Sequence, residues 1–343
     1  MVTTLTKPAR TGHGPTRAAW FVVAVVVLVA AAGLSVMVGA NPMSPGTVLD
    51  TVLGGGTDES RYLVWDQRIP RTAAGLAVGA ALGVAGALIQ AFTRNPLADP
   101  GILGVNVGAS LFVVSGMAYF GLAAATPMIW VAILGAGVTA LVVYTIGSLG
   151  RGGATPLKLA LAGAATSAAL ASIVTAVILP RNDIAGGVRS WQIGGVGGAS
   201  LDSIRQVAPF LLVGFALCLL SARALNALAL GDDLAAGLGE RVAAARGAAA
   251  LGAVILSGAC TAVTGPIGFV GLVVPHACRL LVGVDHRWLL PFSALTGAAL
   301  LTGADVVGRI VARPGEVDVG IITALIGAPF FIYIVRRSKV RAL

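Results

Sequence analysis

The sequence predicts an all-α membrane protein, a polytopic bundle of about ten transmembrane helices with both termini in the cytoplasm. Of the 343 residues, 57% are hydrophobic and only 11% are charged, whereas soluble domains carry about 25% charged residues. The mean hydropathy is +0.93. Uncharged stretches that are long enough, or nearly so, to cross a bilayer core of roughly 20 residues recur at 18–49, 72–93, 102–150, 159–180, 247–278 and 288–304.

Membrane spans must be helices or closed barrels, because hydrocarbon cannot hydrogen-bond an exposed peptide group. The alternating pattern of barrel strands is absent from this sequence, so the spans are predicted to be helices. Glycine, proline and charged clusters divide the apolar stretches. We place the spans near 18–40, 70–91, 102–120, 127–149, 157–179, 206–228, 243–263, 267–283, 288–311 and 318–335.

The first four spans have individual signals. The first follows a basic tail, 1–17, and its apolar run exceeds the roughly 7–15 residues of a signal-peptide core, so we expect it to be retained. The second carries Gly75, Gly79 and Gly83 at four-residue spacing, which permits close backbone contact along one helix face. The third and fourth share an uncharged stretch that is too long for one helix and is divided by a turn at 121–127.

Polar or glycine-rich connections separate the remaining spans. A glycine-rich segment, 182–200, precedes the sixth span, a charged segment, 231–241, precedes the seventh, and a Gly-Pro turn separates the seventh from the eighth. The predicted organisation is a cytoplasmic N-terminal tail, 1–17, one transmembrane domain, 18–335, and a cytoplasmic C-terminal tail, 336–343.

The charge distribution gives the orientation. The chain has 23 Lys and Arg against 14 Asp and Glu, a net charge of +9. With the N-terminus inside, about two thirds of the basic residues fall in inner segments, as the positive-inside rule requires. Topology therefore accounts for the positive charge, and a lipid membrane rather than a nucleic acid is the predicted partner.

Patterns typical of enzymes and metal sites are missing from the sequence. Its only lysines, Lys7, Lys158 and Lys339, lie outside any glycine-rich loop of the kind that binds ATP phosphates. The three cysteines stand singly in apolar stretches, without metal-ligand or disulfide spacing. We predict no catalytic residue, no metal site and no cofactor on this chain.

Four segments together resemble the FecCD family of permeases, the membrane subunits of ferric-siderophore and vitamin B12 importers. They are RIPRTAAGLAVGAALGVAGALIQAFTRNPLADPGILGVNVGAS from Arg68, GPIGFVGLVVPHACRLLVGVDHR from Gly265, GADVVGRI from Gly303 and IGAPFFIYIVRR from Ile326. The resemblance implies a second permease subunit, identical or a paralogue, two cytoplasmic ABC ATPases that carry ATP and Mg, and an extracytoplasmic substrate-binding protein. It also implies a location in the bacterial cytoplasmic membrane.

Three arginines match family positions that receive acidic residues of the binding protein. Arg68 and Arg71 stand at i and i+3 before the second span, so both can face one direction. Arg309 lies near the outer end of the ninth span. We expect exposed cations that steer docking; the alternative is that they only contact lipid headgroups. Asp305, at i−4 from Arg309, is predicted to pair with it.

The break between the second and third spans is the predicted gate. Asn95, Pro96 and Leu97 belong to RNPLADPG, whose two prolines exclude regular helix. The resemblance implies that Asn95 and Leu97 lie at the cytoplasmic gate of the transport path. The other interpretation is an ordinary helix connector.

The segment GDDLAAGLGER from Gly231 to Arg241 is the largest polar interruption on the predicted inner side. It resembles the family's coupling helices, which insert into a cleft on the ATPase. A short helix here would carry its acids at the positive end of the helix dipole and present three apolar residues that a solvated loop would leave uncovered. The predicted coupling residues are Gly231, Asp232, Asp233, Leu234, Ala235, Leu238 and Gly239.

The PHACR motif of the eighth span is predicted to be structural. Pro275, His276 and Arg279 lie near its inner end, where we expect hydrogen bonding rather than metal coordination by a lone histidine.

The predicted function is that of the permease subunit of an ABC importer, which carries a ferric siderophore by alternating access. A cobalamin or haem importer of the same family is the alternative cargo. An ion-coupled secondary transporter would keep ionisable groups near the middle of its spans, and an intramembrane enzyme would bring a nucleophile and base, or metal ligands, together. Neither pattern is found in the sequence.

Overall fold

The computed structural model describes residues 14–122, 124–150 and 155–337, and every regular element in these residues is helical. The longer helices are α1 (Gly14–Met37), α4 (Ile69–Phe92), α5 (Val105–Phe120), α6 (Ala125–Ser148), α7 (Pro156–Ile178), α9 (Leu201–Leu220), α12 (Val242–Thr264), α13 (Val270–Val282), α14 (His286–Val311) and α15 (Val319–Arg337). The shorter ones are α2 (Pro45–Val52), α3 (Asp58–Arg61), the π-helix η1 (Tyr62–Arg68), the 3₁₀ helix η2 (Pro100–Leu103), α8 (Asn182–Ile193), α10 (Ala222–Leu228) and α11 (Asp232–Gly237).

Apolar helices occupy all of the predicted spans. Among the described residues, 7 helices are long and apolar enough to cross a membrane: α1, the continuous segment from α3 through η1 to α4, α6, α7, α9, α12 and α14. Helices α5, α13 and α15 are apolar but shorter. The all-helical membrane fold is confirmed, while the number of crossings and the cytoplasmic location of both termini stay predictions.

The sixth predicted span differs from the structure at both ends. Helix α9 begins at Leu201, because Ser200 and Ser203 form a capping box, and it ends at Leu220, before α10. The usual sequence signature of a capping box has Glu or Gln at the third helical position. Ser203 fills that role here, which explains why the start was predicted five residues late, near 206.

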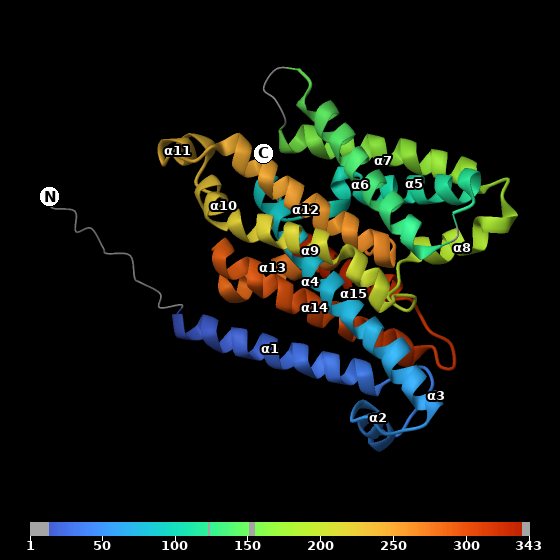
Figure 1. Cartoon of the computed structure of the whole chain (residues 1–343). Coiled ribbons are helices and arrows are strands. Elements are labelled where there is room, and N and C mark those ends of the chain that lie inside the picture. The colour runs from blue at the N-terminus through green and yellow to red at the C-terminus, as the bar shows by residue number, and fades with distance from the viewer. Residues whose placement is uncertain (1–13, 123, 151–154, 338–343) are drawn as a thin grey trace.

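Helix α4 runs through the middle of the bundle, among α12, α13 and α14 (Figure 1). In the most apolar window of the continuous segment from α3 to α4, 78% of the residues are buried, against 11% for α1 and for α7 at the periphery. A methyl group built on Gly79 would lie 2.4 Å from the carbonyl oxygen of Gly297, and one on Gly83 would lie 2.3 Å from that of Ser293. Helices α4 and α14 therefore pack backbone against backbone.

Candidate functional sites at the two ends of the bundle

An arginine cluster, Arg68, Arg71 and Arg309, lies at the end of the bundle where α4 begins. Arg68 donates from Nη1 to the carbonyl oxygens of Val36 and Met37, at 3.0 and 2.9 Å. Its Nη2 donates to the carbonyl oxygen of Asn41 at 2.8 Å. These carbonyls belong to the C-terminal end of α1 and the segment after it.

Arg309 bonds the same end of α1. It donates from Nη1 to the carbonyl oxygens of Ser35 and Val38, at 2.9 and 2.6 Å, and from Nη2 to the Ser35 hydroxyl at 2.7 Å. The last carbonyls of a helix have no partners within it and carry partial negative charge. Two arginines, one in α14 and one at the end of η1, therefore cap α1 and join it to the body of the protein.

Asp305 is the central anion of this end. Its Oδ2 lies 3.0 Å from Nη2 of Arg309, and its Oδ1 lies 2.8 Å from Nη2 of Arg71. The predicted pairing of Asp305 with Arg309 is thus present. Arg71 also donates from Nη1 to Glu316 at 2.5 Å, in the loop between α14 and α15. The ion-pair chain runs from the buried Arg309 outward to the exposed Glu316.

The predicted exposure of the arginine cluster is wrong. Arg309 is 1% exposed and Arg68 is 5% exposed, and the side chain of Arg71 is 11% exposed. Arg68 and Arg71 also bond different elements, α1 and α14, instead of acting side by side. The reason lies in the tertiary structure. The end of α1 brings to this part of the bundle carbonyl groups that need hydrogen-bond donors, and the spacing of residues within one helix does not reveal them.

The predicted gate segment forms a compact turn where α4 ends. The side chain of Asn95 accepts a hydrogen bond from the backbone N–H of Leu97 at 3.0 Å. Asp99 accepts in the same way from Gly101 at 2.9 Å and begins η2. Pro96 and Leu97 are exposed. The local bonds hold the segment in shape while its apolar tip faces outward.

Helix α11 lies at the same end and has the predicted helical form. Leu234 is 62% exposed and Leu238 is 67% exposed. Ala235 was expected beside them, but it is 0% exposed and belongs to the hydrophobic core, so this part of the prediction is wrong. The segment is bounded by Gly231 and Gly239, whose φ angles of +116° and +86° favour glycine.

Asp232, at the start of α11, anchors this helix to the bundle. Its Oδ1 accepts from Nη2 of Arg94 at 2.5 Å and from Nη2 of Arg246 at 2.8 Å. Arg94 lies two residues beyond the end of α4, and Arg246 lies in α12. The acid therefore joins α11 to the gate segment and to the bundle, a role beyond the predicted interaction with the helix dipole. Asp233 lies on the exposed side of α11.

The PHACR residues lie in α13, with Pro275 buried. Arg279 donates to the side-chain oxygen of Gln90 in α4, and the amide nitrogen of Gln90 donates to the carbonyl oxygen of Gly271 at 3.1 Å. The ring of His276 meets that of Phe330 edge to face, with centroids 6.1 Å apart. Gln90 was missed in the sequence, although it is a polar residue within an apolar span.

Asp285 fixes the beginning of α14. It accepts the backbone N–H of Arg287 at 3.0 Å and the amide of Asn226 at 2.6 Å. Burial by itself would raise the pKa of Asp285, but these hydrogen bonds and the charges of Arg287 and Arg17 outweigh it, and the pKa is lowered. The described residues contain no group of His, Cys, Asp and Glu side chains that could hold a metal ion.

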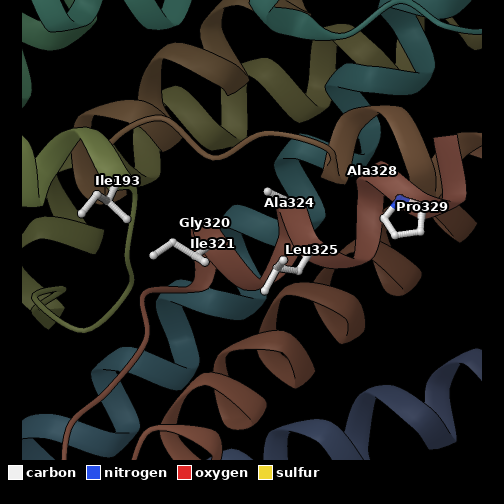
Figure 2. A pocket seen from close by; sticks show the side chains of 7 residues that line it. All are labelled: Ile193, Gly320, Ile321, Ala324, Leu325, Ala328 and Pro329. Carbon is white, nitrogen blue, oxygen red and sulfur yellow. The ribbon is translucent and has the colours of Figure 1, made fainter. Parts of the chain in front are cut away.

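An apolar hollow of about 560 Å³ lies between the end of α8 and one face of α15 (Figure 2). Figure 2 shows its lining side chains, which are Ile193, Gly320, Ile321, Ala324, Leu325, Ala328 and Pro329. The glycine-rich segment before the sixth span thus faces the last helix through Ile193, at the end of α8.

The apolar helices form a membrane bundle, and the short segment at α11 exposes two leucines at one end of it. Residues 12–337 match the FecCD transport family. The chain belongs to this family of ABC importer permeases and is embedded in the cytoplasmic membrane.

The similarity extends over nearly the whole chain. The ferric enterobactin transport system permease protein FepD of Escherichia coli is 44% identical over 91% of this chain and 93% of its own length. The cobalamin import system permease protein BtuC of Halobacterium salinarum is 39% identical over 84% of this chain and 77% of its own length. A solved metal-chelate type ABC transporter in an inward-facing conformation has a TM-score of 0.80 and 26% identity, covering 94% of this chain and 99% of that chain.

Proposed function

We propose that this chain carries a ferric siderophore across the cytoplasmic membrane by alternating access, as the permease subunit of a complete ABC importer. The observation that carries the proposal is the 44% identity to a ferric enterobactin permease over 91% of the chain. The importer would contain a second permease subunit, identical or a paralogue, two cytoplasmic ABC ATPases that bind ATP and Mg, and an extracytoplasmic binding protein.

Helix α11 is the proposed contact with the ATPase. Leu234 and Leu238 point away from the bundle and remain uncovered in the single chain. Two exposed leucines on a short helix favour insertion into an apolar cleft, because burial stabilises each by about 1.5–3 kcal/mol. Asp232 would transmit motion of α11 to Arg94 and Arg246, and through them to the gate segment and α12.

The proposed path runs along the uncovered face of α15 to the gate. Leu325 is exposed on that face and lines the hollow in Figure 2. A second permease subunit facing α15 would enclose the path between the two copies. Asn95, Pro96 and Leu97 would close its cytoplasmic end, since the turn is held by its own hydrogen bond and presents Leu97 outward.

The binding protein is proposed to dock at the arginine cluster. Arg71 would meet its acidic residues directly, because it lies at the outer end of the ion-pair chain beside the exposed Glu316. Arg68 and Arg309 would act by holding the end of α1 beneath that surface. The test is Arg71→Glu against Arg205→Glu, an exposed control in α9. We expect only the first to weaken binding-protein affinity; equal affinities would refute the docking role.

The test of cargo is uptake into proteoliposomes that contain the permease, its ATPase and its binding protein. We expect ATP-dependent uptake of a ferric siderophore from a panel that also includes haem and cobalamin. Uptake of cobalamin alone would favour the second candidate, which the 39% identity to a cobalamin permease supports. Uptake that needs an ion gradient and no ATP would refute ABC import.

The coupling role is tested by Leu234→Asp combined with Leu238→Asp. We expect the ATPase to dissociate, or its ATP hydrolysis to proceed without uptake. Leu53→Asp is the matched control, because Leu53 is also exposed but follows α2 near the arginine cluster. Normal assembly and uptake in the double variant would refute the role of α11.

A further inference from the structure

A second cavity, which the proposed transport path does not use, lies between α6, α9 and α12, and Phe92 of α4, Leu103 of η2 and Leu159 of α7 complete its wall. It has a volume of about 920 Å³ and reaches from Ile133 and Gly258 at one end to Tyr144 and Arg246 at the other. We call it the lateral groove. Its rim includes exposed apolar side chains on α6, α9 and α12. In a protein embedded in the membrane, the groove therefore opens sideways toward lipid.

The length of the lateral groove suits a hydrocarbon chain. The stretch of α12 that lines it, from Ala243 to Gly258, rises about 22 Å. One leaflet of a bilayer core is about 15 Å thick, half of about 30 Å. The groove is thus long enough for an acyl chain in full extension. Glycines on its walls, Gly137 and Gly247, leave open space where side chains would otherwise stand.

The groove has a polar end. Arg246 is the one charged side chain among its described lining residues, and Tyr144 lies at the same end. Tyrosine favours the interface between hydrocarbon and headgroups. An amphipathic occupant would therefore place its apolar part along the helices and its headgroup beside Arg246.

The charge at this end favours an anion. Arg94 and Arg246 both bond the same oxygen of Asp232, so two guanidinium groups share one carboxylate. The side chain of Arg246 is 27% exposed, so it can reach a phosphate at this end of the groove. Arginine binds phosphate well because its planar donors match the phosphate geometry.

We propose that the lateral groove binds an anionic phospholipid, with one acyl chain between α6, α9 and α12 and its phosphate on Arg246. The same arginine bonds Asp232, so the lipid headgroup contacts the anchor of α11. A second protein chain is a poorer occupant, because the groove is long and apolar with one cationic end. The proposal does not depend on the cargo or on the docking partner.

The test is native mass spectrometry of the full chain released from nanodiscs that contain equal amounts of phosphatidylglycerol and phosphatidylcholine. We expect the wild type to retain phosphatidylglycerol with about tenfold preference, the effect of one hydrogen bond to a charged group. Arg246→Gln should remove the preference, and Arg246→Lys should restore part of it. Equal retention of both lipids by the wild type would mean nonspecific lipid only and would overturn the proposal.

A second variant separates the groove from the charge. Gly137→Leu fills the groove without meeting any atom within 4 Å at its Cβ, and Gly33→Leu in α1 is the control with equally open surroundings. We expect Gly137→Leu to lose retained lipid and Gly33→Leu to keep it. Equal retention in the two variants would refute the groove as the site. If Gly137→Leu instead disrupted a dimer and left the amount of retained lipid unchanged, the groove would be a protein interface. That result would also refute the lipid site.

Discussion

Replacement of Gly79 by alanine should loosen the contact between α4 and α14. The new Cβ would lie 2.4 Å from the carbonyl oxygen of Gly297 and 2.9 Å from the Cα of Ala298, both backbone atoms. Since Cβ contacts under 3.0 Å essentially never occur, the two helices must separate by at least 0.6 Å. Overpacking of this kind costs about 1–3 kcal/mol. We expect the free energy of unfolding of Gly79→Ala in mixed micelles to fall by that amount.

Gly75→Ala is the matched control on the same helix. Its Cβ would lie 3.0 Å from the Thr302 hydroxyl, a side-chain atom that can rotate away, and no closer than 3.5 Å to backbone. We expect no loss of stability, because alanine is favoured over glycine within a helix by about 0.5–1 kcal/mol. Denaturant titration followed by circular dichroism measures both variants. Equal destabilisation of the two, or an unchanged Gly79→Ala, would refute the argument that backbone contact fixes the distance between α4 and α14.

Three further perturbations test the polar contacts. Asp305→Asn should lower the free energy of unfolding by about 3–5 kcal/mol, because it removes the buried carboxylate that pairs with both Arg71 and Arg309. Arg309→Met should also lower it, because it removes the hydrogen bonds to the end of α1, although Asp305 keeps Arg71 as a partner. The double variant should lose less than the sum, and strict additivity in unfolding titrations would contradict the pairing. The lowered pKa of Asp285 means that its contribution to stability is present above its unfolded pKa of about 3.9 and is lost as pH falls through the lower folded value. Asp285→Asn should therefore show a smaller loss of stability on acidification than wild type, and identical pH profiles would contradict this. Glu316→Gln removes the exposed carboxylate that pairs with Arg71. If the binding protein docks at Arg71, this variant should bind it about two- to fivefold more tightly in surface plasmon resonance. Weaker binding would show that Glu316 itself contacts the binding protein.

The sequence predicts the helices well because each is a local pattern. Runs of apolar residues give the spans, and the Gly79 and Gly83 spacing gives a face that can meet another backbone. The acids after Gly231 likewise predict the start of α11, since helix dipoles act within one turn. These signals need no knowledge of what lies across the bundle.

The sites depend on contacts between distant segments, which the sequence does not show. Arg309 bonds Ser35, 274 positions away, and Arg71 bonds Glu316, 245 positions away. The arginines are buried and not exposed as predicted, because the carbonyls at the end of α1, which lie far away in the sequence, accept their hydrogen bonds. Ala235 was placed on the exposed face for a similar reason: its neighbours along the chain do not reveal which side of a six-residue helix meets the bundle.

The π-helix η1 has a consequence for insertions and deletions. Such segments are usually single-turn bulges, in which one extra residue is accommodated within an α-helix. Removing one of residues 62–67 would let the backbone continue as a regular α-helix. The preceding residues would keep nearly the same direction relative to Arg68 and α4, because the wide turn had absorbed the extra residue. A deletion within the regular helix α4 would instead turn Arg68 by about 100° and remove its hydrogen bonds to the end of α1. The π-helix is therefore the part of this long segment where a change of length disturbs the attachment of the first helix least.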